Sequence, residues 1–460
     1  RKCLQNSVKQ ELIFNIDLEV EEKKWFDCND QDIDFDVLLD LDKKYGIGIV
    51  GEVITSDRRV GVGLVRGGLT YPDDIVDKIL DGSHKNVYKY VQGLFNFLEV
   101  LLEEHKIDGV FCYAVAGAPT VALAHVCKFK KIPFLRLSAT RIGDGFIVDT
   151  DFRGRLLPIS QAFNESARLE KDVNSKASEF LENYRNKPQL PGYEKFNNQM
   201  LNKSYLFPRS RDFLVFLCAF SLKFVLPKEI RHRVKVLGLK RRFFNLKTEF
   251  NKLSFDFSKF DSDIPKWKYF YYPLHVDPEA STMVLSPMHT DQLSIIEAIA
   301  KSIPANSILV IKEHPSMIGK RTKLFYDQIR KIPRVKLLSP RVDNFQLIKG
   351  ASGVLVITGT SALEGLFLGK KSIIIGDSPY LTIGSGMIFE PCLYNLPSAF
   401  QKLDEIDEID DDKIIRYISI VMSNSFEMKA SLLWGDYNSH PKSERERVSQ
   451  TIKNEILKLL

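Results

Sequence analysis

The second half of the chain alternates between short apolar runs and segments whose apolar residues recur at helical spacing. Runs rich in β-branched and aromatic residues predict strands at 267–273, 307–312, 335–338, 354–357 and 371–376. Helices are expected to begin near residues 291, 320, 343 and 361. Because strands that alternate with helices form parallel sheets with right-handed crossovers, the pattern predicts a doubly wound α/β domain over 263–425.

The first half shows a weaker pattern of the same kind. Apolar residues recur at helical spacing over 86–105, and a second helix is expected to open at Gly117, with Pro119 at its first position. Strands are expected on either side of that helix, at 107–115 and 132–137. This βαβ pattern predicts an N-terminal Rossmann-like domain over 1–160. The glycine-rich run from Tyr45 to Ile54 is expected to be a strand.

Between and after these domains the sequence is mostly charged and helical in character. Residues 161–262 are expected to form a helical insertion or linker, and 426–460 a helical tail. An apolar run followed by a basic cluster occupies 213–242. Such a segment can lie on the anionic inner surface of a membrane, or it can be a buried helix with a solvated basic face, and the sequence leaves both alternatives open.

Length, charge and cysteine content limit the number of domains, the partners and the location that are expected. The chain has 460 residues, more than one hydrophobic core usually supports, so two domains are expected. The net charge of +6 is mild, and acids and bases are mixed along the chain, so no nucleic-acid partner is expected. Six cysteines are scattered without ligand spacing, which predicts no zinc site and a cytoplasmic location. The first residues lack the apolar core of a signal peptide, so none is expected.

Two predicted strands end in polar clusters that suit a phosphate. Lys312, Glu313 and His314 follow one strand, and Thr358 to Ser361 follow another and lead into a helix. In an open parallel sheet, ligands bind outside the carboxyl ends of the strands, so both clusters are expected to face one crevice. A cation, an imidazole, hydroxyls and a helix N-terminus favour a phosphate-bearing ligand such as an activated sugar. His314 could donate a hydrogen bond to the phosphate or protonate it.

Each of these residues also has a structural alternative. Lys312 could form a salt bridge with Glu313, and Ser361 with Glu364 has the spacing of a capping box. Glu364 could instead accept hydrogen bonds from ribose or sugar hydroxyls. The residues expected to bind the donor are Lys312, His314, Pro315, Thr358, Gly359, Thr360, Ser361, Glu364, Glu279 and Ser281.

The general base of a sugar transfer is expected from the N-terminal domain. Asp144 stands between two glycines just beyond a strand, and glycines allow a close approach of the backbone. Gly-Asp-Gly is also a common turn, and Asp149 and Asp151 are the next candidates. Gly117, Thr120 and Arg141 are expected to bind the acceptor.

Four motifs carry a resemblance to a known family: the run from Tyr269 to Thr282, Asp291-Gln-Leu, Lys312-Glu-His-Pro and the run from Thr358 to Gly365. They resemble bacterial capsular and surface polysaccharide biosynthesis proteins of the GT-B glycosyltransferase architecture. The resemblance is clear over 265–380 and weaker over 105–155. It implies two Rossmann-like doubly wound domains that face a central cleft, joined by a helical insertion or linker.

The His-Pro motif is similar to that of sialyltransferases, polysialyltransferases and Kdo transferases. This similarity implies that His314 contacts the phosphate of a CMP-sugar, that Thr360 and Ser361 bind the same group, and that Asp144 is the base. Gly143 departs from the pattern, because it stands where those families carry a first acidic residue. The resemblance implies no bound metal and no bound cofactor, with the nucleotide-sugar as co-substrate.

The predicted function is therefore a metal-independent glycosyltransferase. It would move a sugar from a nucleotide donor, with a CMP-sugar such as Kdo or a sialic-acid-like sugar favoured, to a saccharide or glycolipid acceptor of a surface or capsular polysaccharide. Two alternatives stay open: a UDP-sugar epimerase of the same architecture, and a non-catalytic component of polysaccharide assembly or export.

Overall fold

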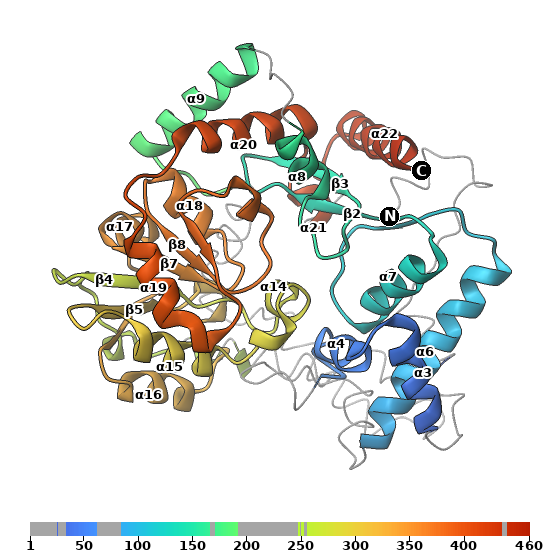
Figure 1. Cartoon of the computed structure of the whole chain (residues 1–460), viewed down its shortest axis with the longest axis horizontal. Coiled ribbons are helices and arrows are strands. Elements are labelled where there is room, and N and C mark those ends of the chain that lie inside the picture. The colour runs from blue at the N-terminus through green and yellow to red at the C-terminus, as the bar shows by residue number, and fades with distance from the viewer. Residues whose placement is uncertain are drawn as a thin grey trace.

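Two α/β units lie side by side in the computed structural model, each built around its own sheet (Figure 1). The structure describes residues 25, 34–61, 84–165, 171–191, 247–248, 250–252, 255–434 and 439–460. The predicted α/β class with parallel sheets is confirmed. The apolar-basic segment 213–242 lies outside the described residues. Within the described ranges, no helix is long and apolar enough to cross a membrane.

The C-terminal unit contains a six-stranded sheet in which every neighbouring pair is parallel. Its strands are β4 (Tyr269–Pro273), β5 (Ile308–Lys312), β6 (Val335–Leu338), β7 (Gly353–Val356), β8 (Ser372–Ile374) and β9 (Met387–Phe389). The first five were predicted. The strand β9 was not, because three half-exposed residues give no pattern to detect.

Helices cover both faces of this sheet, as the doubly wound pattern requires. One face packs against α15 (Gln292–Ser302), α16 (Lys323–Lys331) and α19 (Leu396–Asp404). The other packs against α17 (Asn344–Gly350), α18 (Ser361–Phe367) and α20 (Asp411–Asn424). Because both faces are buried, the central strands are apolar throughout, which explains why the sequence shows them as continuous runs.

The strand order β6-β5-β4-β7-β8-β9 reverses direction at β4. From β4 the chain proceeds outward to β5 and β6, then crosses back to β7 on the other side. A crevice opens outside the carboxyl ends of the strands at such a switch point, and ligands bind there. The loops after β4, β5 and β7 are therefore the ones that can form a site.

The N-terminal unit contains a smaller sheet of mixed direction. Strands β1 (Val110–Cys112) and β2 (Phe134–Ala139) are parallel and flank α7 (Ala118–Lys130), so the predicted βαβ unit is present. Strand β3 (Gly145–Asp149), which was not predicted, runs antiparallel to β2. The turn between β2 and β3 is too short for the crossover that a parallel pair needs.

Residues 45–54 do not form the predicted strand. They include α4 (Ile49–Thr55), which packs with α3 (Phe35–Tyr45) against α6 (His84–Glu104) and α7. Ile49 and Val53 are buried on one face of α4. Packing of this face against the neighbouring helices outweighs the strand preference of its β-branched residues. The helix predicted over 86–105 is present as α6.

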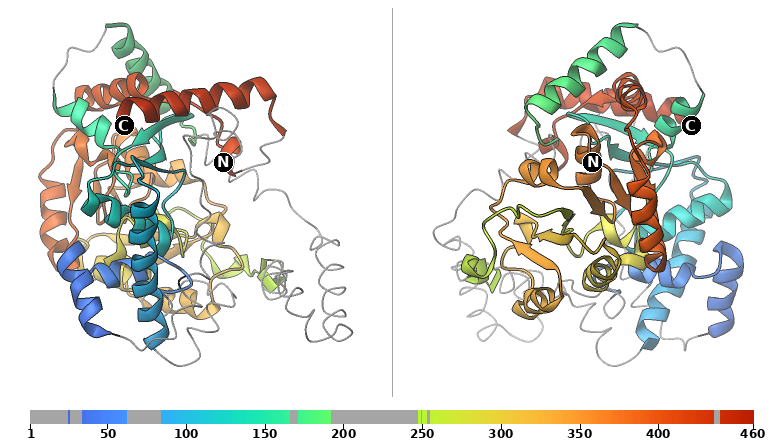
Figure 2. Two further views of the ribbon diagram at one scale, coloured as in Figure 1. Left: turned by 90° about the vertical axis from the view of Figure 1, so that its right-hand side faces the viewer. Right: turned by 60° about the vertical axis from the view of Figure 1, so that its left-hand side comes forward.

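The C-terminal segment of the chain returns to the N-terminal unit. Helix α20 packs against α8 (Leu157–Asn164) and α9 (Lys171–Asn186), and β10 (Phe426–Glu427) joins the N-terminal sheet beside β3. The tail helix, predicted from 443, is α22 (Lys442–Leu459). Figure 2 shows α20, α22 and α9 lying over one end of both units.

Candidate functional site

The loops that follow β4 and β7 are in direct contact at the switch point. Nε2 of His275 accepts a hydrogen bond from the backbone N–H of Thr358 at 3.3 Å, and the Thr358 hydroxyl donates to the carbonyl of Ser281 at 2.7 Å. A Cβ at Gly359 would lie 3.1 Å from Nε2 of His275, so glycine permits this close approach. Burial, with smaller effects of nearby cations, lowers the pKa of His275 to about 3.

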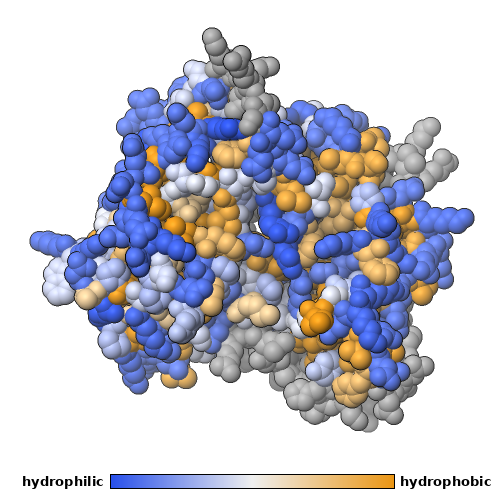
Figure 3. Space-filling view, viewed as in Figure 1, coloured by the Kyte–Doolittle hydropathy of each residue, from blue (hydrophilic) through white to orange (hydrophobic). Residues whose placement is uncertain are grey.

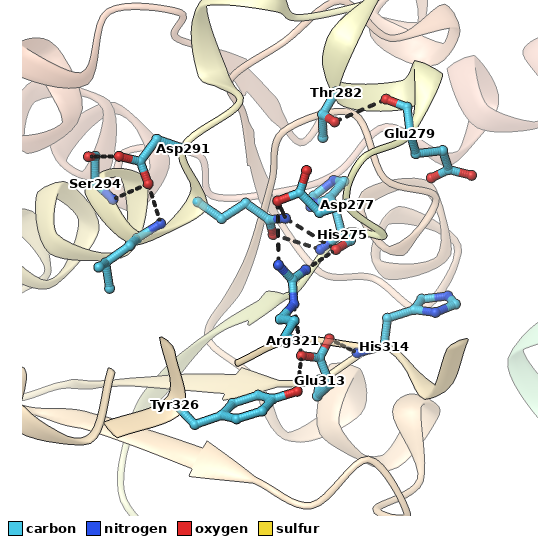
Figure 4. Close-up of polar contacts among 12 residues, drawn as sticks. His275, Asp277, Glu279, Thr282, Asp291, Ser294, Glu313, His314, Arg321 and Tyr326 are labelled. Carbon is cyan, nitrogen blue, oxygen red and sulfur yellow. Dashed lines mark hydrogen bonds and ion pairs between the residues drawn. The ribbon is translucent and has the colours of Figure 1, made fainter. Parts of the chain in front are cut away.

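A buried cluster of charges fixes the loops after β4 and β5 to each other (Figure 4). The guanidinium of Arg321, only 1% exposed, lies 2.9 Å from Glu313 and 3.4 Å from Asp277, and it also donates to the carbonyl of His275. Tyr326 donates to the same Glu313 carboxylate at 2.8 Å. Burial raises the pKa of Asp277 to about 6, although Arg321 opposes this shift. Arg321 thus holds both loops in place.

Lys312 and Glu313 do not form the salt bridge that the sequence left open as an alternative. Successive side chains of a strand point to opposite faces, so Glu313 turns to Arg321 while Lys312 turns to the other face. The buried Lys312 ammonium lies near the carboxylates of Asp343 and Glu364, whose charges raise its pKa. Burial has the larger effect and lowers the pKa of Lys312 to about 8.

His314 caps the short 3₁₀ turn Pro315–Met317 with its ring. Nδ1 accepts from the backbone N–H of Ser316 at 3.2 Å, and it lies 2.7 Å from the Ser316 hydroxyl. Burial, with nearby cations, lowers the pKa of His314 to about 4. The neutral ring therefore carries its proton on Nε2. Figure 4 shows the ring turned away from the Arg321 cluster.

The capping box expected at Ser361 and Glu364 is absent. Thr360 occupies the N-cap position of α18 and makes no capping hydrogen bond with its side chain. The buried Glu364 carboxylate instead accepts a hydrogen bond from Asn344 at 3.1 Å. The Glu364 carboxylate, in the first turn of α18, is therefore positioned beside Lys312 and Asn344.

Glu279 and Ser281 lie at the start of α14 (Ala280–Met283), on the loop after β4. The Ser281 hydroxyl donates to the Glu279 carboxylate at 2.8 Å. The backbone of Ser281 contacts Thr358, so this pair borders the switch point.

Asp144 and Arg141, from the turn before β3, reach the C-terminal unit across a cavity of about 500 Å³. Thr360 and Glu364 of α18 line the opposite wall. The structure thus brings the predicted base and acceptor residues together with two predicted donor residues. His314 and Lys312 are not among the residues that line this cavity.

The other acceptor candidates have roles within the N-terminal unit. Asp57, which the sequence gave no reason to select, accepts a hydrogen bond from the first backbone N–H of α7 at 3.3 Å. A Cβ at Gly117 would lie 3.1 Å from the same carboxylate. The Thr120 hydroxyl donates to the carbonyl of Gly117. Both candidates therefore shape the start of α7.

The two other candidates for the general base, Asp149 and Asp151, form structural contacts within the N-terminal unit. Asp149 is fully buried and accepts from the backbone N–H groups of Leu156 and Leu157 at 2.8 and 3.1 Å. Asp151 forms an ion pair with Arg155 at 3.0 Å. In the part of the chain that the structure describes, no group of three or more His, Cys, Asp or Glu side chains is placed to hold a metal ion.

Sequence reasoning missed the residues that position the site, above all Arg321, Asn344 and Tyr380. Tyr380 donates to the carbonyl of Gly359 at 2.5 Å, and Asn344 links Glu364 to the hydroxyl of Tyr271. Each comes from an element distant in sequence from its partner or from a loop without periodic pattern. No local signal distinguishes them from surface polar residues.

Residues 175–386 match a family model described as "Capsule polysaccharide biosynthesis protein". The predicted resemblance to capsular polysaccharide biosynthesis proteins is confirmed by this match. The match begins within the predicted helical insertion or linker, upstream of the four motifs that carry the resemblance. It does not include residues 105–155, where the resemblance was weaker. Protein FixF of Sinorhizobium fredii (strain NBRC 101917 / NGR234) is 30% identical over 118 residues. The aligned part is 24% of this chain and 27% of that protein, so the chain matches about a quarter of its relative's length.

Solved structures with similar chains include two of KpsC from Thermosulfurimonas dismutans. The beta Kdo 2,4 transferase is 11% identical, with a TM-score of 0.38, over 68% of this chain and 78% of that chain. The beta Kdo 2,7 transferase is 12% identical, with a TM-score of 0.38, over 80% and 90%. UDP-GlcNAc 2-epimerase of Methanocaldococcus jannaschii, in complex with UDP-GlcNAc and UDP, is 14% identical, with a TM-score of 0.26, over 88% and 96%. These low values assign no activity to the chain.

Proposed function

We propose that this protein is a glycosyltransferase that transfers a sugar from a CMP-sugar to a hydroxyl of a surface or capsular polysaccharide. The observation that carries the proposal is the cavity in which Asp144 of one unit faces Thr360 and Glu364 of the other. A transfer between two substrates needs a base beside the acceptor and polar groups beside the donor, on walls that exclude water. The match of 175–386 to capsule biosynthesis proteins supports the polysaccharide acceptor.

The donor phosphate would bind at the loop after β5. His314 is neutral at pH 7 and offers the N–H of Nε2, so it acts as a hydrogen-bond donor to a phosphoryl oxygen rather than as an acid. Lys312, two residues before His314, supplies positive charge in a buried position, where electrostatic interactions are stronger than in water. Together they stabilise the charge that the departing CMP develops.

Asp144 would accept the proton of the acceptor hydroxyl. Its turn is exposed to the cavity, whereas the neighbouring carboxylates Asp149 and Asp151 are buried in structural contacts. Arg141, on the same turn, lines the cavity beside Asp144 and can orient the acceptor. In this proposal the N-terminal unit supplies the base for the acceptor, and the C-terminal unit binds the phosphate of the donor.

A panel of nucleotides tests the proposal through the melting temperature. CMP should stabilise the protein more than UMP, UDP or GDP does, since ligand binding to the folded state raises its stability. His314→Ala should abolish this stabilisation. The matched control His440→Ala, beside the tail helix, should retain it. A preference for UDP would contradict the CMP-sugar donor, and the absence of a response to every nucleotide would contradict the transferase.

A further inference from the structure

The largest share of the cavity wall beside Asp144 comes from the end of α9 and the residues that follow it. This stretch lies in the predicted helical insertion or linker and has no role in the proposed donor chemistry. The residues that it contributes are Phe180, Asn183, Tyr184, Asn186, Lys187, Gln189, Leu190 and Pro191. The cavity is therefore built from three parts: this stretch, the turn that carries Asp144, and α18.

The side chains of this wall suit a sugar ring. Asn183, Asn186 and Gln189 carry amides, each of which can both donate and accept hydrogen bonds with hydroxyl groups. Aromatic rings form the adjoining surface: Tyr184 packs edge-on against Phe367 with ring centroids 5.2 Å apart. Amides beside aromatic surface match a pyranose, which presents hydroxyls at its rim and C–H groups on its faces.

The charges that line the cavity favour an uncharged ligand. The cations Arg141 and Lys187 are balanced by the carboxylates of Asp144 and Glu364. A phosphate would meet both signs here, whereas a hydroxyl can donate to the carboxylates and accept from the cations. Figure 3 shows hydrophilic residues gathered between the two units on this face. The phosphate-binding residues His314 and Lys312 lie outside the cavity lining.

The wall is held rigidly, as a selective binding site requires. Arg185, within the same turn of α9, donates both terminal guanidinium nitrogens to Asp411 of α20 at 2.7 and 2.6 Å. Its Nε donates to the carbonyl of Phe367 at the end of α18 at 2.9 Å. Leu181 and Tyr184 are buried in the core of the C-terminal unit. The amides are thus presented from a fixed helix.

We propose that this cavity is the binding site for the acceptor saccharide, and that it takes a neutral pyranose whose reacting hydroxyl lies at Asp144. The inference rests on the proposed function for the role of Asp144. The ribose of the donor nucleotide is the other hydroxyl-rich ring that could occupy the cavity. The experiment below separates the two sources.

Saturation-transfer NMR on the full chain tests the site. The probes are the methyl glycosides of glucose, galactose and N-acetylglucosamine, with CMP in a parallel sample. At least one glycoside should receive saturation on its ring protons from the parent protein. The double variant N183A/N186A should weaken that binding about tenfold, because two hydrogen-bonding side chains are lost. CMP binding should be unchanged in the variant.

The matched control is Glu182→Ala, an exposed residue of α9 that does not line the cavity. It should bind glycoside as the parent does. Unchanged glycoside binding in the double variant, or no saturation of any glycoside in the parent, would overturn the inference. Loss of CMP binding in the double variant would overturn it as well, because the nucleotide would then occupy the cavity. Loss of CMP binding in His314→Ala with glycoside binding intact supports both proposals, and a parent that binds glycoside but no nucleotide contradicts only the donor proposal.

Discussion

His275 shows how a buried neutral imidazole makes the stability of the switch point depend on pH. Its folded-state pKa of about 3 lies below the ordinary value of 6.5, so the unfolded chain binds a proton that the folded chain does not. This difference in proton binding stabilises the folded state fully above pH 6.5, and the stabilisation decreases as the pH falls toward 3. Between pH 7 and pH 5 we expect a loss of about 2 kcal/mol from this residue.

His275→Gln keeps an acceptor for the N–H of Thr358 and removes the titration. Urea unfolding at pH 7 and pH 5 measures the free energy of unfolding of both chains. The parent should lose more stability than the variant, by about 2 kcal/mol. Equal losses in the two chains would contradict the assignment of a depressed pKa to His275.

Arg321 is the residue on which both loops of the proposed phosphate site depend. Arg321→Met removes the cation and leaves the carboxylates of Glu313 and Asp277 buried without it. Breaking a buried ion pair in this way costs about 3–5 kcal/mol. Chemical denaturation should show this loss, together with weaker nucleotide binding, because the carbonyl of His275 also loses a donor.

Arg330→Met is the control at the surface of the same unit. Its partner Asp327 lies 2.7 Å away, and both side chains are about a third exposed. An exposed pair of this kind contributes at most about 1 kcal/mol. A similar loss of stability in the two variants would show that the Arg321 cluster has no special role.

At the scale of elements, α17 links secondary structure to the charge of the site. Asp343 caps this helix by accepting from the backbone N–H of Gln346 at 2.7 Å, and its charge also raises the pKa of Lys312. Asp343→Ala should therefore cost about 1 kcal/mol through the lost cap. Asp343→Asn keeps the cap and removes the charge, so it should leave stability nearly unchanged and lower the pKa of Lys312.

The nucleotide-binding pH profile measures the effect of the Asp343 charge, which both variants remove. Since Lys312 loses its proton at lower pH in either variant, the affinity for CMP should begin to decrease at a lower pH than in the parent. Titration of CMP between pH 6 and pH 9 measures this. An unchanged profile in Asp343→Asn would contradict the role of Lys312 at the phosphate.

Whether a helix or strand can be predicted from the sequence depends on how its residues are buried in the fold. The central strands β4, β5 and β7 are covered on both faces, so their apolar runs are visible in the sequence and were predicted. Strand β10 depends on pairing with β3, which is distant in the sequence, and α4 depends on packing against α6 and α7. These contacts leave no local pattern, so β10 was missed and α4 was predicted as a strand. Strand β3 was missed as well, although it pairs with β2 across a short turn.

The same division applies to the candidate site. A strand that is predicted from its apolar run also shows where it ends. The sequence could therefore indicate that His314, Lys312 and the Thr358 loop border a crevice. The residues that support the site could not be selected, because Arg321 reaches Glu313 and Asn344 reaches Glu364 only through the fold. The cavity wall from α9 lies in the predicted helical insertion or linker, and its part in the cavity could not be predicted, since helical charge patterns are common in surface helices.

At the scale of the whole molecule, the last 22 residues pack on the N-terminal unit, although they follow the C-terminal unit in the sequence. Val448 and Ile452 of α22 are buried against Leu137 of β2 and Phe146 of β3. Strand β3 follows directly from the turn that carries Asp144. The tail therefore stabilises the sheet that presents the proposed base, although it lies at the other end of the sequence.

Ile452→Ala tests this dependence. Truncation of a buried isoleucine costs about 2–5 kcal/mol, and the loss should fall on the N-terminal unit. Hydrogen exchange should show faster opening of β2 and β3 than of β4 and β5, because local stability follows local packing. Gln450→Ala, on the exposed face of the same helix, should leave both sheets unchanged. Since the proposed phosphate site belongs to the C-terminal sheet, CMP should still stabilise Ile452→Ala. Loss of that response would show that the proposed donor site depends on the N-terminal sheet as well.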